Sequence, residues 1–307
     1  MVSDTLGGHV ELTHHYARVN GVRLHWVEAG SGPPVILLHG FPETHRSWDL
    51  QLPFLVARGY RVIAPDLRGY GESARPAGGY DLDTLVADVV ALCRHVSNGR
   101  VRLVGHDWGG AITWLVASRH PDLLERVVVI DCAHPILMER ALRSNPRQLA
   151  KSWYMFFFQL PLVPELWLSS RGAKNLAGMF RGTPGAERAP REVVNASRAA
   201  VGRISSLGPP LAYYRSALRG AARALWRGER HELPRIDLPV TLLWGEHDAC
   251  FVLELAEEHR RLAPELSLHI LRGAGHFAHQ EAPEQVDALL AEALGDPAPG
   301  VAARSRG

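Results

Sequence analysis

The sequence predicts an α/β fold in which a mostly parallel central sheet is flanked by helices and carries an inserted helical segment. Short apolar runs rich in β-branched residues alternate with helical patterns, which is typical of a parallel sheet covered on both faces. These runs are almost continuously apolar, as expected for strands buried on both sides. Roughly a hundred residues then pass without a strand pattern before two further strands follow.

The first strands are expected to form an antiparallel hairpin. The stretch "YARVNGVRLHWVEAG" holds two alternating patterns joined at Asn20 and Gly21, a pair that favours the tight turn of a hairpin. Buried strands are expected in "PVILLHG", "YRVIAPD", "VRLVGHD" and "RVVVIDCAH", and later in "PVTLLWGEHD" and "LSLHILRGAGH".

The strand pattern also predicts the domain organisation. Residues 1–134 and 235–295 are expected to form the sheet-containing core domain. Residues 135–234 carry helical stretches broken by glycine and proline, and we call this inserted segment the cap. Residues 296–307 are small and polar, which predicts a disordered tail.

Composition describes an ordinary globular protein. The chain has 307 residues, of which 46% are hydrophobic and 21% charged, and its formal net charge is +2. This charge gives no case for a nucleic-acid or anionic-membrane partner. No signal-peptide pattern and no apolar run of roughly 18 residues is present, so a cytoplasmic protein without a membrane span is expected. Oligomeric state cannot be read from the sequence.

Cysteine spacing indicates neither a disulfide framework nor a zinc knuckle. The three cysteines, Cys93, Cys132 and Cys250, lie far apart and form no CxxC pair. We therefore expect no metal and no cofactor.

An aspartate stands at the centre of a strand–turn–helix motif. In "VRLVGHDWGG" an apolar strand enters a Gly-x-Asp-x-Gly turn and then an apolar helix, the setting of the nucleophile elbow, whose usual centre is serine. A lone aspartate in such a turn is often only a helix cap. The flanking glycines and the acid and histidine found later in the chain favour Asp107 as a nucleophile.

Candidate partners for Asp107 follow two later strands. Active sites of open parallel sheets gather at the carboxyl ends of the strands, where "GEHD" brings Asp248 and "GAGHF" brings His276. The order nucleophile, acid, histidine is that of an α/β-hydrolase triad. Asp131, at the end of "VVVID", is the alternative acid.

Five motifs in this order resemble the epoxide-hydrolase branch of the α/β-hydrolase superfamily. They are HGFPE, GYGES, GHDWGG and the late aspartate and histidine, and the resemblance covers nearly the whole chain except its ends. It implies an α/β-hydrolase fold and an enzyme that converts an epoxide to a vicinal diol. The expected partners are a small apolar epoxide and water.

The resemblance explains why an aspartate replaces the serine. Attack on an epoxide carbon by serine would give an ether, whereas attack by Asp107 gives an ester that can be hydrolysed. His276, oriented by Asp248, is expected to activate the water. The backbone N–H groups of Phe41 and Trp108 are expected to stabilise the oxyanion that forms on the aspartate side chain.

Ring opening also needs a proton donor, which we expect from the cap. The segment "SWYMFFFQLPLVPE" resembles the Tyr-x-x-x-Phe-Gln-x-Pro segment of the family, with Tyr154 in the tyrosine position, and "AYYR" resembles its Asn-Tyr-Tyr-Arg segment, with Tyr214 in the second. Ala212 replaces the usual asparagine, so Tyr213 remains a competing assignment.

Apolar residues near these tyrosines predict an apolar substrate. Trp153 and Phe158 of the cap, with Phe41 and Trp108 of the core, are the expected substrate contacts. Aromatic side chains at successive helical positions point in different directions, so some of the three consecutive phenylalanines will pack in the core.

Two other functions compete with epoxide hydrolysis. Haloalkane and haloacetate dehalogenases use the same aspartyl-ester chemistry, and haloalkane dehalogenases also carry a tryptophan where this chain has Trp108. Their second halide donor is often an asparagine where this chain has Phe41. The other alternative is a catalytically silent ligand-binding or scaffold protein, which the presence of Asp107, Asp248 and His276 disfavours.

Overall fold

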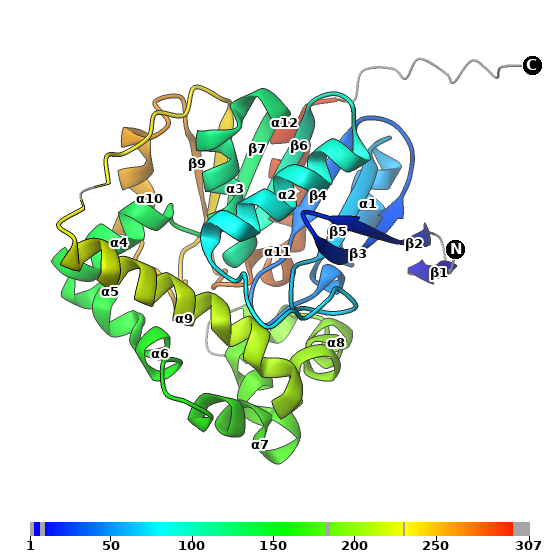
Figure 1. Cartoon of the computed structure of the whole chain (residues 1–307). Coiled ribbons are helices and arrows are strands. Elements are labelled where there is room, and N and C mark those ends of the chain that lie inside the picture. Colours follow the sequence, from blue (N-terminus) through cyan, green and yellow to red (C-terminus); the bar gives the residue numbers. More distant parts are fainter. Residues whose placement is uncertain (1–2, 7–9, 182–184, 230, 297–307) are drawn as a thin grey trace, which may run out of the picture.

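The computed structural model describes residues 3–6, 10–181, 185–229 and 231–296. Its strands are β1 (Ser3–Leu6), β2 (Val10–Val19), β3 (Val22–Ala29), β4 (Pro34–Leu38), β5 (Arg61–Asp66), β6 (Val101–His106), β7 (Leu124–Ile130), β8 (Val240–Gly245) and β9 (Ser267–Leu271). They form one nine-stranded sheet in the order β1-β2-β3-β5-β4-β6-β7-β8-β9 (Figure 1).

The predicted hairpin and the predicted parallel strands are both confirmed. Strands β2 and β3 pair antiparallel across a turn at Asn20 and Gly21, whose φ angles of 45° and 75° suit the mirror-image turn of a two-residue hairpin. Strand β3 pairs antiparallel with β5, and from β5 through β4, β6, β7 and β8 to β9 every pairing is parallel. The predicted fold class is therefore confirmed.

Helices cover both faces of the sheet. The core helices are α1 (Gln51–Ala57), α2 (Leu82–Val96), α3 (Trp108–Arg119), α10 (Glu254–Glu257), α11 (Ala278–Glu281) and α12 (Pro283–Leu294). Alternate residues of one strand point to opposite faces. On β4, Ile36 and Leu38 pack in the cluster with α2 and α3, whereas Val35 and Leu37 pack in the cluster with α1 and α12 (Figure 1).

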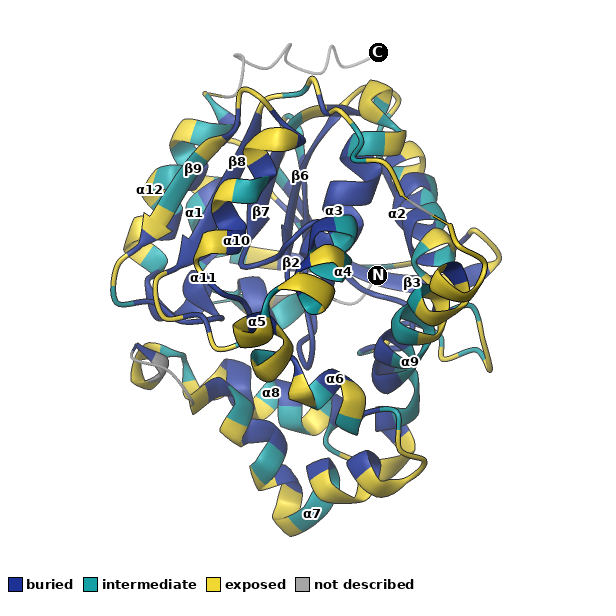
Figure 2. Cartoon of the chain, turned by 90° about the vertical axis from the view of Figure 1, so that its left-hand side faces the viewer, coloured by how far each residue is buried: buried dark blue, intermediate teal, exposed yellow. Residues whose placement is uncertain are grey.

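A second group of helices is inserted in the chain between strands β7 and β8, which pair with each other in the sheet. These are α4 (Pro135–Ser144), α5 (Pro146–Lys151), α6 (Trp153–Phe157), α7 (Val163–Gly178), α8 (Arg191–Val201) and α9 (Ile204–Trp226). No strand occurs among the described residues of this segment. Figure 2 shows α5 to α9 gathered beside one end of the sheet, with exposed outer surfaces and buried residues turned inward.

Shorter turns and the chain ends complete the description. Single 3₁₀ turns occur at His45–Trp48, Pro121–Leu123, Met179–Arg181, Ala186–Arg188 and Glu258–Arg261. Within the described ranges, no helix combines the length and apolarity that crossing a membrane requires. The predicted disordered tail falls almost entirely in residues 297–307, which lie outside the described part of the chain.

The turn between β6 and α3 is held in a tight backbone conformation. Asp107 has φ 48° and ψ −118°, a combination that side-chain-bearing residues rarely adopt. A Cβ atom on Gly105 would lie 2.3 Å from the Gly109 carbonyl oxygen and 2.3 Å from Thr113 Oγ1. The helix therefore approaches the end of the strand so closely that only glycine fits at position 105.

We expect Gly105→Ala to lower the free energy of unfolding by about 1–3 kcal/mol or more, because the added methyl group overpacks the strand–helix junction. Urea denaturation measures this change. Gly220→Ala in α9 is the matched control: nothing lies within 4 Å of its added Cβ, so a gain of roughly 0.5–1 kcal/mol in stability is expected. Equal stability of Gly105→Ala and the parent would contradict the close contact.

Candidate active site

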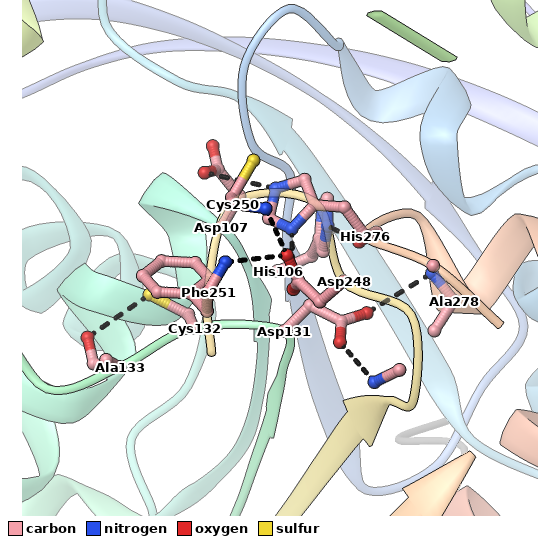
Figure 3. A network of polar contacts seen from close by, with 12 residues as sticks. His106, Asp107, Asp131, Cys132, Ala133, Asp248, Cys250, Phe251, His276 and Ala278 are labelled. Carbon is pink, nitrogen blue, oxygen red and sulfur yellow. Dashed lines mark hydrogen bonds and ion pairs between the residues drawn. The ribbon is translucent and has the colours of Figure 1, made fainter. Parts of the chain in front are cut away.

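Asp107 lies at the carboxyl end of β6, immediately before α3. The Phe41 backbone N–H donates a 2.7 Å hydrogen bond to its Oδ1. Its Oδ2 lies 3.5 Å from His276 Nε2. The carboxylate is therefore held by the loop after β4 and also faces the imidazole of His276, as Figure 3 shows.

His276 bridges Asp107 and Asp248. Its Nδ1 hydrogen bonds to Asp248 Oδ2 at 2.9 Å, so its Nε2 is directed to Asp107. The other oxygen of Asp248 accepts hydrogen bonds from the backbone N–H groups of Cys250 at 2.6 Å and Phe251 at 2.9 Å. The two backbone N–H groups thus hold the Asp248 carboxylate in place, and Asp248 in turn orients the ring of His276.

Asp131, the alternative acid, makes different contacts. It accepts hydrogen bonds from the backbone N–H groups of Gly245 at 2.6 Å and Ala278 at 3.3 Å, and no hydrogen bond between it and His276 is found. Burial and the nearby charge of Asp248 raise the pKa of Asp131 well above its usual value. In the described structure, Asp248 is the acid that contacts the histidine.

The electrostatic surroundings favour the charged form of His276 in this state. Burial alone would lower the pKa of His276, but Cys250, Asp248 and Asp107 outweigh burial and leave that pKa well above its usual value. The carboxylates of Asp248 and Asp107 thus favour protonation of the imidazole.

Tyr154 of α6 and Tyr214 of α9 lie at the same cavities as Asp107. Their ring centroids lie 5.8 Å apart in an edge-on arrangement. Burial, reinforced by the charge of Asp107, raises the pKa of both phenols well above the usual value. Both hydroxyls therefore keep their protons at neutral pH.

Tyr213, the competing assignment, points elsewhere. Its hydroxyl donates a 2.7 Å hydrogen bond to the backbone carbonyl of Arg68 in the core. Its side chain lines neither cavity. Of the two adjacent tyrosines, only Tyr214 faces Asp107.

Two cavities of very different size meet at Asp107. The larger, of about 390 Å³, runs from Asp107 past Trp108 and Leu115 to the exposed residues Asp83 and Arg119. The smaller, of about 40 Å³, lies against His276 and is bounded by Phe41, Met179, Cys250 and Phe277. Asp107, Tyr154 and Tyr214 line both cavities.

The two residues predicted to stabilise the oxyanion, Phe41 and Trp108, both line the cavities at Asp107. Phe41 lines the small cavity and Trp108 the large one. Trp108 is also the first residue of α3, so its N–H makes no hydrogen bond within the helix.

Two predicted substrate contacts, Trp153 and Phe158, line neither cavity. Trp153 is 58% exposed, because successive residues of a helix point in different directions and its ring lies against Phe157 rather than beside Tyr154. Phe158 is 1% exposed and packs behind the cavity walls, with its ring centroid 5.7 Å from that of Phe41 and 5.0 Å from that of Tyr214. It supports the rings that line the site.

A buried polar network under the site was not predicted. Glu43 of the HGFPE motif hydrogen bonds to His106 Nδ1 at 2.9 Å, and His106 Nε2 hydrogen bonds to the His276 backbone carbonyl at 2.8 Å. Gln280 also donates to Glu43. The acidic residue in HGFPE and the histidine in GHDWGG were visible signals, because charged side chains next to buried strands need partners.

Two other unpredicted features concern the cap and the small cavity. Arg215 of α9 pairs with Glu165 at 2.8 Å and donates to the Phe158 carbonyl at 2.9 Å, so it ties α9 to the segment that follows Tyr154. Cys250 lines the small cavity, and burial raises the pKa of its thiol.

Some of these residues also lie close enough to share a metal ion. Their ligand atoms fall within 4.8 Å of one another in two sets, Glu43 with His106 and His279, and Asp248 with Cys250 and His276. Protein hydrogen bonds already occupy Glu43 and Asp248, which fits a hydrogen-bonded network better than a metal centre.

Comparison with known proteins identifies the family of this chain. Residues 33–283 match the α/β-hydrolase fold family. Epoxide hydrolase 3 of Xenopus tropicalis is 35% identical over 294 residues, covering 92% of this chain and 77% of the relative. Epoxide hydrolase 4 of Homo sapiens is 34% identical over 291 residues, covering 91% of this chain and 78% of the relative.

A solved structure of an epoxide hydrolase has the same fold as this chain. The crystal structure of Bacillus megaterium epoxide hydrolase in complex with an inhibitor superposes with a TM-score of 0.80 at 29% identity, covering 91% of this chain and 99% of that one. The chain belongs to the α/β-hydrolase fold family. Within that family it belongs to the branch of the epoxide hydrolases.

Proposed function

We propose that this protein converts an apolar epoxide to a vicinal diol through a covalent ester on Asp107. One observation carries the proposal: a single carboxylate faces a histidine–carboxylate pair on one side and two protonated phenols on the other. A nucleophile, a hydrolytic base and proton donors therefore surround one small volume. The names of the relatives support the same reaction.

In the first half-reaction, Asp107 attacks one epoxide carbon. Its Oδ1 is held by the Phe41 N–H, so Oδ2 is the oxygen that forms the new bond. The carbon–oxygen bond of the ring breaks, and the leaving oxygen takes a proton from Tyr154 or Tyr214. The product is an ester of Asp107 that carries a neighbouring hydroxyl group.

In the second half-reaction, a water beside His276 attacks the ester carbonyl carbon. His276 takes a proton from this water, and negative charge develops on Oδ1, where the N–H groups of Phe41 and Trp108 stabilise it. The ester bond then breaks, and His276 returns the proton to the departing diol oxygen. Asp107 is left as a carboxylic acid, and its proton passes to the tyrosine that had given one to the ring oxygen. One water is consumed in each cycle.

Electrostatics can order these two steps. The negative charge of Asp107 lies 3.5 Å from His276 Nε2 and contributes to its raised pKa. Ester formation removes that charge, which lowers the pKa of His276 and favours the neutral imidazole. The histidine thus becomes a competent base at the stage when a base is needed.

The cavities indicate the shape of the substrate. The cavity of about 390 Å³ fits one bulky apolar arm. The cavity of about 40 Å³ beside His276 fits a few waters or a small group, since one water needs roughly 10–15 Å³. We infer an epoxide with one large apolar substituent and an otherwise unhindered ring.

The cap has a specific part in this proposal. Residues 135–234 supply both phenols and one wall of the large cavity, while residues 1–134 and 235–295 supply the nucleophile, acid and histidine. Substrate would therefore bind between the two proposed domains. The Arg215–Glu165 pair would keep the cap helices in register over Asp107.

Dehalogenation is the second candidate, and one observation favours it. The Trp108 indole N–H is buried and has no hydrogen-bond partner among the described residues, so it could donate to a halide. Phe41 offers no side-chain donor beside it, whereas two phenols lie within the same cavities. Proton donation to an oxygen suits these phenols better than halide binding.

Product analysis tests the function and the substrate shape together. The purified protein is incubated with styrene oxide, trans-stilbene oxide or chloroacetate, and diol and chloride are measured separately. We expect diol from styrene oxide, at least tenfold lower kcat/KM for the stilbene oxide, and no chloride. Chloride alone would favour the dehalogenase, and the absence of every product would favour the catalytically silent alternative.

His276→Gln is expected to separate the two half-reactions. The variant keeps Asp107 and both tyrosines, so substrate should still alkylate it, but the ester should persist because the base is missing. Intact-protein mass spectrometry should show a stoichiometric mass gain, which peptide mapping assigns to Asp107. A folded variant without an adduct under saturating substrate would exclude this assignment of the base.

Replacing Tyr154 and Tyr214 with phenylalanine tests the proton donors. Each change removes only a hydroxyl, and we expect each to slow alkylation by up to about 10²–10⁴-fold. The double variant should lose nearly all ring opening, non-additively, because either phenol can assist alone. Single-turnover kinetics measures the alkylation rate.

Tyr213→Phe is the matched control for this pair, because it loses the neighbouring hydroxyl that bonds to Arg68. Its alkylation rate should equal that of the parent. Ring opening at the parent rate in the double variant would show that other groups donate the proton.

A further inference from the structure

A second cluster of ionisable side chains lies at the hairpin side of the sheet. His14 and Tyr16 are two residues apart on β2, so their side chains share one face. His25 of β3 pairs with Tyr16 across the hairpin and faces the same side. Glu72, in the loop after β5, accepts a hydrogen bond from the Tyr16 hydroxyl. None of these residues lines either cavity.

Two imidazoles in this cluster meet nitrogen to nitrogen. His14 Nδ1 lies 2.8 Å from His25 Nε2, and the ring centroids are 5.0 Å apart in a stacked arrangement. A carboxylate oxygen of Glu72 completes a set of ligand atoms within 4.8 Å of one another. His25 is buried, His14 is half-buried and Glu72 is exposed, so solvent can reach the open side.

Asp66 fixes the orientation of His25 from behind. Its Oδ2 lies 2.8 Å from His25 Nδ1, and its Oδ1 lies 2.9 Å from His45 Nδ1. Asp66 accepts a hydrogen bond from the Nδ1–H of His25, which leaves the lone pair of His25 Nε2 directed at His14 Nδ1.

This arrangement is the one that orients histidines at metal centres. A ligating imidazole typically donates its second N–H to a carboxylate, which fixes the tautomer and raises the basicity of the ligand. Two imidazoles and one carboxylate suit zinc and its first-row neighbours. Two zinc–nitrogen bonds in tetrahedral geometry separate the nitrogens by roughly 3.3 Å, so His14 and His25 need move apart only slightly.

We propose that His14 Nδ1, His25 Nε2 and a Glu72 carboxylate oxygen bind one divalent transition-metal ion of the zinc class. The ion replaces the hydrogen bond between the two imidazoles. The proton on His14 Nδ1 leaves to solvent and His14 Nε2 takes one up, so both histidines bind as neutral imidazoles, and water completes the coordination. The bound ion connects β2, β3 and the loop after β5. The site is separate from Asp107 and supplies stability, with no part in the proposed reaction.

Cobalt and zinc titrations test the site. Full-length protein without a histidine tag is stripped with chelator and titrated with CoCl₂ by visible absorption and with ZnCl₂ by calorimetry. We expect the parent to show a ligand-field band and a zinc-dependent rise in melting temperature. His14→Ala should lose one bound ion or weaken its affinity at least tenfold, and Glu72→Gln should weaken it as well.

His15→Ala is the matched control, because His15 is the next residue of the same strand and its ring stacks on Trp26, 5.3 Å away between centroids. It should bind the ion like the parent. Both histidine variants should keep the parent rate with styrene oxide, which shows that each is folded. No cobalt band in the parent, or unchanged stoichiometry and affinity in His14→Ala, would overturn the proposal.

Discussion

The active site depends on the close approach of two backbone segments, the turn at Asp107 and the loop after β4. The left-handed conformation of Asp107 turns its side chain away from β6 and out at the end of the sheet. A Cβ atom on Gly40 would lie 2.4 Å from Asp107 Cβ, so the loop after β4 presses directly against the nucleophile. This contact brings the Phe41 N–H within hydrogen-bonding distance of the carboxylate. The contact between Gly40 and Asp107 thus holds Asp107 in its strained conformation, and the same loop supplies the Phe41 N–H as an oxyanion donor.

The sequence carried enough information for the sheet and for the residues at its carboxyl end. Buried parallel strands leave continuous apolar runs, and the residues that follow them converge because parallel strands end at one edge. Asp107, Asp248 and His276 lie together for this reason. The sequence favoured Asp248 over Asp131 because "GEHD" follows the later strand directly, and in the structure His276 hydrogen bonds to Asp248, whereas Asp131 bonds to backbone N–H groups.

The cap was harder to predict in detail, because no shared sheet edge brings the residues of its helices together. Successive side chains of a helix point in different directions, so two adjacent residues can have very different surroundings. Tyr154 faces Asp107, whereas Trp153 beside it is exposed. Tyr213 and Tyr214 divide in the same way between core and cavity. Glu43 and His106 were visible in the sequence as polar residues next to buried strands, but their pairing with each other and with Gln280 was not, since the three come from distant segments.

The two halves of the proposed reaction need opposite electrostatic conditions, and one buried cluster can meet both. Alkylation needs a charged Asp107 next to neutral phenols, and burial together with that charge keeps the phenols protonated. Ester hydrolysis needs a neutral His276, which the same negative charge disfavours. Because alkylation itself removes the charge, the chemistry of the first step prepares the second without movement of any domain. A serine nucleophile is neutral before attack, so it could not change the protonation of the histidine in this way.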